Sequence, residues 1–187
     1  AVRVEGNADS GTGERHQSEV AKQLIRSRRQ FPVELVIRLG DNIYGRQEPE
    51  DFARKFEEPY RPLLDAGVRF YASLGNHDNQ RNRFYAPFNM GGERYYTYAV
   101  KNVRFFVLDT DELDPKQLAW LEDALKKATE PWKIVYFHHP LYSDGGTHGS
   151  AVSLRVVLQP LFVTYALPAV LAGPAPLLEH PPPPHGP

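Results

Sequence analysis

Short apolar runs rich in Val, Ile, Phe and Tyr recur along the 187-residue chain. Their length and their content of β-branched and aromatic residues are typical of β-strands. We predict strands over residues 33–40, 68–75, 103–109, 132–139 and 168–173, with a weaker one where Val2 and Val4 alternate. The sequence YYTYAV, followed by Lys101, Asn102 and the run from residue 103, indicates a β-hairpin with a two-residue connection.

Amphipathic segments separate these runs and predict helices over residues 14–29, 51–67 and 114–128. The buried faces of the first two should hold Val20, Ala21 and Leu24, and Phe52, Phe56 and Leu63, respectively. In the third, Asp114 is a good N-cap, Pro115 a good first residue, and Gln117 completes a capping box. Strands that alternate with helices, plus one hairpin, indicate an α/β layered domain with a mixed sheet.

Composition excludes several classes of function. The formal charge of -1 gives no bias toward nucleic acid or acidic membranes, and the basic residues 26–30 fit the last turn of a helix. We therefore expect no nucleic-acid partner, and no protein partner is evident. The absence of Cys excludes disulfides and thiolate metal sites.

The chain has no apolar run near the roughly 20 residues that span a bilayer, and no basic-then-apolar leader precedes Val2. We expect a soluble protein without a membrane span. Because the chain starts at Ala1 without Met, export stays open if a leader has been removed, and the location is otherwise unknown.

The last 14 residues differ from the rest, because residues 174–187 hold seven of the 17 prolines. Proline at this density blocks helices and central strands, so we expect a disordered, extended tail. The predicted organisation is one domain over residues 1–173, followed by this proline-rich tail.

Polar residues follow four of the predicted strands. They are Asp9 after the short first stretch, Asp41, Asn42 and Tyr44 after residues 33–40, Asn76, His77 and Asp78 after residues 68–75, and His138 and His139 at the end of 132–139. In open α/β sheets, ligands bind outside the carboxyl ends of the strands. These strand ends deliver Asp9, Asp41 with Tyr44, Asn76 with His77, and a histidine of the 138–139 pair to one edge, which we interpret as a ligand set.

The residue types suit a pair of hard to borderline cations. Two ions about 3.5–4 Å apart can clamp the attacking and leaving oxygens of a phosphoryl displacement. A carboxylate such as Asp41 can bridge both ions, and Asn76 adds an oxygen without adding charge. Tyr44 is the unusual member, because a phenol with a pKa near 10 binds mainly to a strongly Lewis-acidic ion such as Fe(III).

The motifs GDNIY (40–44), GNHD (75–78) and HHPLYS (138–143) resemble those of the calcineurin-like metallophosphoesterases, and the Tyr after Gly-Asp resembles the purple acid phosphatase branch. The resemblance covers residues 9–173. It implies a metallophosphatase-type sandwich of two mixed β-sheets flanked by helices (αββα). It also implies hydrolysis of small phosphate-ester substrates by a metal-bound hydroxide at a dinuclear centre.

The resemblance also implies a role for each ligand. Asp9 and Tyr44 would bind the first metal, Fe(III), while Asp41 would bridge both metals. Asn76 and His138 would bind the second metal, which would be Fe, Zn or Mn.

Two histidines would act on the substrate in the same pattern. His77 would contact the phosphate and donate a proton to the leaving group, and His148 lies where such enzymes often place another substrate-contacting His. Each of these residues also has a structural explanation, since Asp and Asn are common turn residues, Tyr44 could cap the core and His148 could be a loop residue. His139 is better explained as a packing or loop residue.

Two departures from the family pattern keep alternatives open. Ala8 precedes Asp9 where the family has Gly, and Pro174 and Pro176 stand where the family has the two histidines of Gly-His-x-His. Each metal would lose one ligand. The chain is therefore either a metal-dependent phosphatase, or a catalytically impaired homologue or truncated product that retains the fold and partial metal or phosphate binding.

Overall fold

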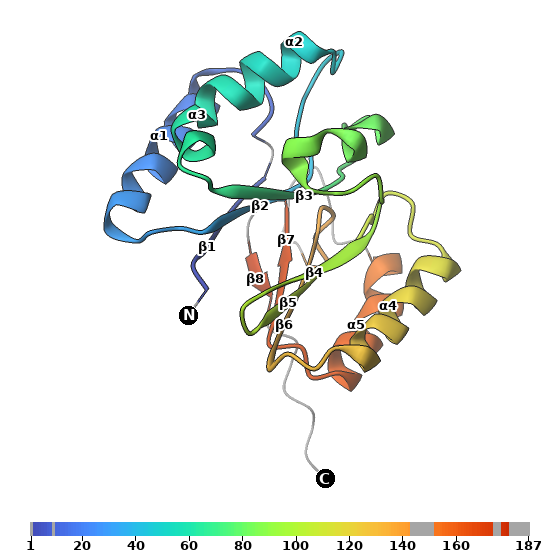
Figure 1. Cartoon of the computed structure of the whole chain (residues 1–187). Helices are drawn as coiled ribbons and strands as arrows, with labels where there is room; N and C mark the ends of the chain where they lie inside the picture. Colours follow the sequence, from blue (N-terminus) through green and yellow to red (C-terminus); the bar gives the residue numbers. More distant parts are fainter. Residues whose placement is uncertain (1, 9, 143–151, 174–176, 180–187) are drawn as a thin grey trace.

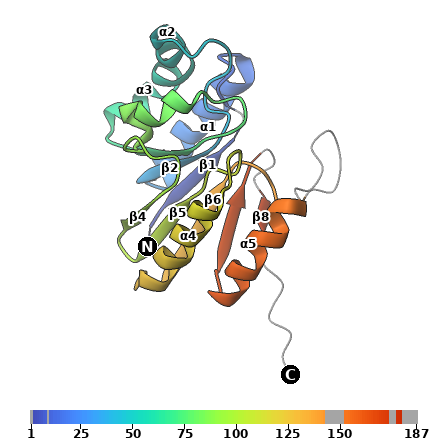
Figure 2. The same ribbon diagram turned by 90° about the vertical axis from the view of Figure 1, so that its right-hand side faces the viewer.

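A computed structural model describes residues 2–8, 10–142, 152–173 and 177–179. Two β-sheets pack face to face in Figure 1, and Figure 2 shows helices on the outer side of each sheet. The order of the layers is therefore helices, sheet, sheet, helices. This confirms the predicted α/β sandwich of the αββα type.

The described residues form a smaller sheet in the order β1 (Val4–Asn7), β2 (Leu35–Leu39) and β3 (Arg69–Ser73). Both of its strand pairs are parallel, whereas we expected two mixed sheets. The crossovers explain this difference. Helix α1 (Arg15–Gln30) joins β1 to β2, and β2 is joined to β3 by α2 (Pro49–Phe52), the π-helical turn η1 (Ala53–Glu57) and α3 (Glu58–Asp65). Each crossover returns the chain to the same end of the sheet, so the next strand runs parallel.

The larger sheet is mixed, in the order β4 (Tyr96–Val100), β5 (Val103–Val107), β6 (Trp132–Phe137), β7 (Ala169–Ala172) and β8 (Leu177–Glu179). The predicted hairpin is confirmed, because β4 and β5 pair antiparallel across Lys101 and Asn102. Helices α4 (Pro115–Lys127) and α5 (Val152–Thr164) cover the outer face. Among the described helices, none combines the length and apolar character that a membrane span requires.

Two elements of the structure are absent from the predictions made above. Helix α5 lies between β6 and β7, and β8 forms within the stretch expected to be a tail, as an antiparallel partner of β7. Residues 174–176 and 180–187 lie outside the described residues, so a disordered tail there stays a prediction. Short 3-10 turns, η2 (Gln80–Phe84) and η3 (Ala86–Phe88), fill the connection between β3 and β4.

Strand alternation divides the core into three layers, because successive side chains point to opposite faces. In β2, Leu35, Ile37 and Leu39 face the other sheet, whereas Val36 faces the helices. In α1 the buried residues are Gln17, Ala21 and Leu24. Val20, which we expected on that face, is 39% exposed, because the helix turns it away from the sheet.

The N-terminus of α4 is only partly as predicted. Asp114 caps the helix, since its Oδ1 accepts a hydrogen bond from Gln117 N at 2.8 Å. The Gln117 side chain does not complete a capping box. It is fully buried and instead bonds the main chain of Asp109, with Oε1 accepting from N at 2.9 Å and Nε2 donating to O at 3.0 Å.

Tyrosines fill part of the layer between the sheets. Tyr98 on β4 stacks on Tyr71 on β3 with ring centroids 3.8 Å apart, and its hydroxyl lies 3.3 Å from the Tyr136 hydroxyl on β6. Burial raises the pKa of Tyr96, Tyr98 and Tyr136 above the ordinary value for a phenol. The folded protein therefore retains phenolic protons that the unfolded chain releases.

Alkaline pH should consequently destabilise the protein. The contribution of these phenols to stability is complete below the unfolded-state pKa of about 10 and is lost as the pH rises through the higher folded-state values. We expect the urea midpoint to fall between about pH 9 and about pH 11, and Tyr98→Phe to reduce that fall because one raised pKa disappears. A midpoint that stays constant over this range would contradict the prediction.

Candidate metal centre

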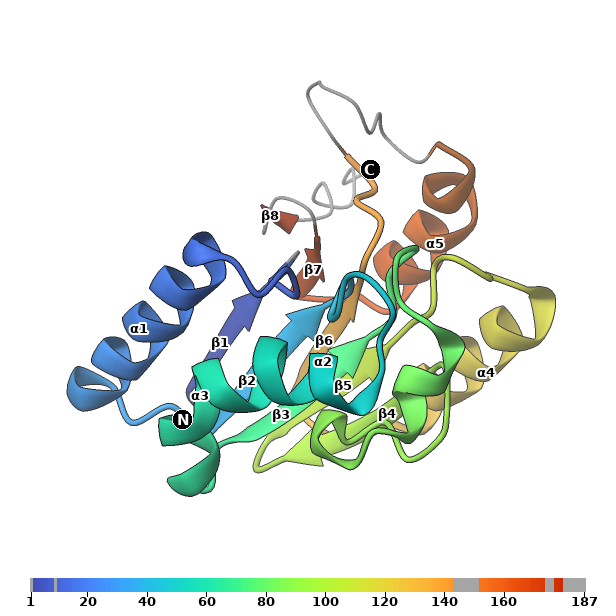
Figure 3. The ribbon, with the colours of Figure 1, turned by 90° about the horizontal axis from the view of Figure 1, so that it is seen from above.

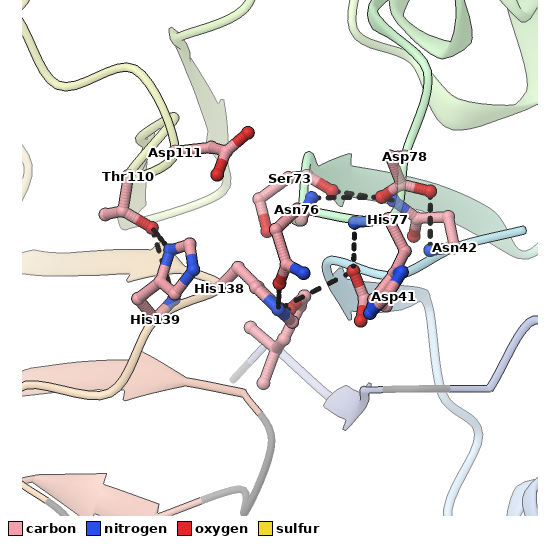
Figure 4. A network of polar contacts seen from close by, with 12 residues as sticks. Asp41, Asn42, Ser73, Asn76, His77, Asp78, Thr110, Asp111, His138 and His139 are labelled. Carbon is pink, nitrogen blue, oxygen red and sulfur yellow. Dashed lines mark hydrogen bonds and ion pairs between the residues drawn. The ribbon is translucent and has the colours of Figure 1, made fainter. Parts of the chain in front are cut away.

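Three of the predicted ligands lie together at the carboxyl ends of strands from both sheets. Asp41 follows β2, Asn76 follows β3 and His138 follows β6. The segments that leave these strands lie on the same side of the molecule in Figure 3, and Figure 4 shows the three side chains pointing toward one another. Asp41 and His138 are each 3% exposed, whereas Asn76 is exposed.

The contacts of His138 fix which ring nitrogen faces this site. Its Nδ1 lies 2.8 Å from the main-chain oxygen of Leu39, and because a carbonyl can only accept, Nδ1 must carry the proton. In the neutral ring, Nε2 then presents a lone pair. That nitrogen lies 3.1 Å from Asn76 Oδ1 and 3.6 Å from Asp41 Oδ1. Leu39, the partner of Nδ1, is the last residue of β2 in the smaller sheet, whereas His138 follows β6 in the larger one. The orientation of the ring therefore depends on both sheets.

Asp41 is held in an uncommon backbone conformation, with φ of 50°. Its Oδ1 accepts a hydrogen bond from His77 N at 3.0 Å, and its Oδ2 accepts one from the Tyr44 hydroxyl at 2.8 Å. The Tyr44 and His77 rings lie 5.1 Å apart. The Asp41 carboxylate therefore links Tyr44, another predicted ligand, to His77, the residue predicted to contact the substrate. Strained backbone of this kind is often found where surrounding contacts fix a functional side chain.

Two glycines allow these groups to approach. Gly40 has φ of 86°, and a Cβ there would lie 2.5 Å from His138 Nδ1. A Cβ at Gly75 would lie 2.4 Å from Asp41 Oδ1. A side chain at either position would displace a predicted ligand. The glycines of GDNIY and GNHD therefore allow His138 and Asp41 to lie close to the backbone of these loops.

A partly buried network of hydrogen bonds joins the two loops that carry Asp41 and Asn76. Asp78 accepts hydrogen bonds from Asn42 N at 2.8 Å, Asn42 Nδ2 at 2.7 Å, Gly75 N at 3.0 Å and Ile43 N at 3.2 Å. Burial raises the pKa of Asp78, while the N–H groups of Gly75, Ile43 and Asn42 oppose that shift. The sequence placed Asn42 and Asp78 at the strand ends but gave them no role. The structure shows that they connect the segments that carry Asp41 and Asn76.

The remaining predicted residues are not all placed. Asp9 and His148 lie outside the described residues. His139 bonds Thr110, with its main-chain N donating to Oγ1 at 3.1 Å and its Nδ1 lying 3.0 Å from the same oxygen. Burial, followed by the charge of His138, lowers the pKa of His139. These contacts agree with its interpretation as a loop residue.

The donor set fits one cation. In the neutral state of His138, the Nε2 lone pair meets the oxygen lone pairs of Asn76 and Asp41, and a cation among the three would relieve their mutual repulsion. Imidazole and oxygen donors suit Zn, Mn or Fe. Within the described ranges no group of three or more His, Cys, Asp or Glu gathers, since Asn76 and Tyr44 supply the other donors.

Comparison with known proteins identifies the family of the chain. Residues 11–173 match the family described as calcineurin-like phosphoesterase. Tartrate-resistant acid phosphatase type 5 of Mus musculus is 28% identical over 191 residues, which cover 82% of this chain and 58% of that protein. The chain thus spans little more than half the length of this relative.

Solved structures share the fold at lower identity. The structure described as GAP50, the anchor in the inner membrane complex of Plasmodium, aligns with a TM-score of 0.77 and 20% identity, over 92% of this chain and 65% of that one. Purple acid phosphatase PPD1 from yellow lupin seeds aligns with a TM-score of 0.69 and 17% identity, over 92% and 37% of the two chains. The protein therefore belongs to the calcineurin-like phosphoesterase family, and the expected likeness to its purple acid phosphatase branch is confirmed.

Proposed function

We propose that the protein is a metal-dependent hydrolase of small phosphate esters, similar to an acid phosphatase. The observation that carries this proposal is the convergence of His138 Nε2, Asn76 Oδ1 and Asp41 Oδ1. Membership of the phosphoesterase family supports the reaction class. The proposed domain spans residues 1–173, followed by the proline-rich residues 174–187, within which β8 pairs with β7.

The described residues have two different roles in this proposal, metal binding and substrate contact. Asp41, Asn76 and His138 hold one ion. When bound, the metal would polarise a phosphoryl oxygen and lower the pKa of water. The His77 side chain is exposed next to this site, while its main-chain N is bonded to Asp41 and its main-chain O accepts from Gln47 Nε2 at 2.6 Å. The fixed backbone supports the proposal that His77 would contact a substrate phosphate.

The iron ion of a dinuclear centre belongs to the same proposal. Asp9 and Tyr44 would hold it as Fe(III), with Asp41 shared between both ions. The Tyr44 hydroxyl donates to Asp41 Oδ2, so its proton must leave before the oxygen can bind iron as a phenolate. His148 would also contact the substrate. The ion held by Asn76 and His138 would be Fe, Zn or Mn.

The second candidate is a homologue that binds metal or phosphate without turnover. The observation that favours it is the pair Pro174 and Pro176 at the positions of the family's histidines. Three protein ligands with water suffice for catalytic zinc, so one site could still function.

Metal removal distinguishes the two candidates. Protein dialysed against a chelator should lose hydrolysis of 4-nitrophenyl phosphate, and Mn²⁺, Zn²⁺ or Fe should restore it. Calorimetric titration of the dialysed protein with Mn²⁺ provides the second readout. Binding without turnover would identify the impaired homologue, and neither binding nor turnover would overturn the proposed function.

A further inference from the structure

Arg38 is a buried cation on β2, only 1% exposed. It lies on the helix-facing side of the smaller sheet, where alternation would place an apolar side chain. The rings of Phe56, Phe88 and Tyr60 surround its guanidinium, with centroids 5.2, 5.5 and 5.6 Å from the central carbon. Burying a charge is costly, and an apolar residue of similar volume is often as stable or more stable at such a position. Packing alone therefore does not explain why an arginine occupies this position.

The guanidinium directs two of its nitrogens to a single residue. Nε donates to Asn42 Oδ1 at 2.9 Å, and Nη2 donates to Asn42 O at 2.7 Å. The third nitrogen, Nη1, forms no hydrogen bond with a described residue. A planar fork can hold the side chain and the main chain of one residue together, which a lysine ammonium cannot do with the same geometry.

Asn42 passes this constraint on to the second loop. With its oxygens held by Arg38, its amide Nδ2 points to Ser73 O at 2.7 Å and Asp78 Oδ2 at 2.7 Å. Asp78 lies two residues after Asn76 and accepts from Gly75 N. A continuous series of hydrogen bonds therefore runs from Arg38 through Asn42 to Asp78, within the loops that carry Asp41 and Asn76.

We infer that Arg38 is a positioning residue, which fixes Asn42 and Asp78 so that the Asp41 and Asn76 oxygens face His138. The inference rests on the proposed metal site. Positioning groups of this kind typically change metal affinity by about 10- to 100-fold when they are replaced. A residue that only filled the core would affect stability and leave affinity unchanged.

The test compares three variants in two measurements. Arg38→Met removes the fork and keeps the length, Arg38→Lys keeps the charge, and Arg61→Met removes an exposed arginine of α3 as the matched control. Mn²⁺ affinity is measured by calorimetry at a temperature where circular dichroism shows each variant to be folded. We expect at least about tenfold weaker binding for Arg38→Met, an intermediate loss for Arg38→Lys and none for Arg61→Met. Affinity equal to wild type in folded Arg38→Met would overturn the inference.

Amide hydrogen exchange in the metal-free protein gives the second measurement. The amides of Asn42 and Ile43 bond Asp78, and the amide of His77 bonds Asp41, so their exchange reports the position of both loops. In Arg38→Met these three amides should exchange at least about tenfold faster relative to Val135 in β6. Unchanged ratios would also overturn the inference.

The two measurements separate this inference from the proposed function. If Arg38→Met does not fold, Arg38→Lys carries both measurements. Wild type that binds no Mn²⁺ would refute the metal site, and the exchange ratios would then decide whether Arg38 positions the loops.

Discussion

Replacing Asp41 with asparagine should abolish metal-dependent phosphate-ester hydrolysis. The substitution removes a negative charge from the point where Asn76, His138 and the Tyr44 hydroxyl meet, while Oδ1 can still accept from the His77 amide. The fold should therefore remain while the cation loses its only anionic ligand among these residues. We expect kcat/KM for 4-nitrophenyl phosphate to fall by about a thousandfold or more, as when a transition-state charge loses its counter-charge.

The matched control for this variant is Asp65→Asn, which removes an exposed carboxylate at the end of α3. Near-ultraviolet circular dichroism should be the same for both variants and wild type. Mn²⁺ affinity should fall in Asp41→Asn alone. Turnover of Asp41→Asn within about tenfold of wild type would exclude Asp41 as a metal ligand.

Replacing Gly40 with alanine should destabilise the protein by several kcal/mol. The new Cβ would meet His138 Nδ1 at 2.5 Å, in a ring that is closely surrounded and bonded to Leu39 O. To this clash is added the strain of a positive φ of 86°, which for alanine costs about 1 kcal/mol. Together we expect a loss of about 3–5 kcal/mol in the free energy of unfolding, measured by urea denaturation.

Gly67→Ala separates the two causes. Gly67 has a similar φ of 75°, but a Cβ there would find nothing within 4 Å. Gly67→Ala should therefore lower the free energy of unfolding only through the backbone strain, by about 1 kcal/mol. Equal losses at Gly40 and Gly67 would show that the approach of His138 to β2 does not depend on the missing side chain.

The elements that the sequence predicted well are those whose signal is local. The strands with alternating or continuous apolar residues and the helix that begins at Pro115 appear within a few residues of the expected bounds. Helix α5 was missed because its residues give little periodicity: only Leu158 and Phe162 are fully buried, and Pro160 lies inside it. The expectation of two mixed sheets was wrong for the smaller sheet, whose described strands form only parallel pairs. Strand direction depends on the path of the crossovers, which is not a local signal.

The candidate site divides in the same way. Asp41 and Asn76 could be predicted to meet, because each follows a strand and the carboxyl ends of parallel strands share one edge. His138 reaches them from the other sheet, because the carboxyl end of β6 lies next to that edge. Arg38 could not be recognised, because a charged residue within a strand pattern ordinarily faces water. Its burial depends on Phe56 and Phe88, which are distant in sequence. The Asp78 contacts likewise join residues about 36 positions apart.

The parallel pairing of the smaller sheet also affects the order of folding. Val4 pairs with Leu35 and Leu35 pairs with Arg69, so each pair closes a loop of more than 30 residues. In contrast, the β4–β5 hairpin closes across Lys101 and Asn102 alone. Because local contacts form sooner than those that close long loops, the hairpin should form early and β1, β2 and β3 should assemble late. The loops that carry Asp41 and Asn76 would then be among the last parts of the molecule to acquire their native shape.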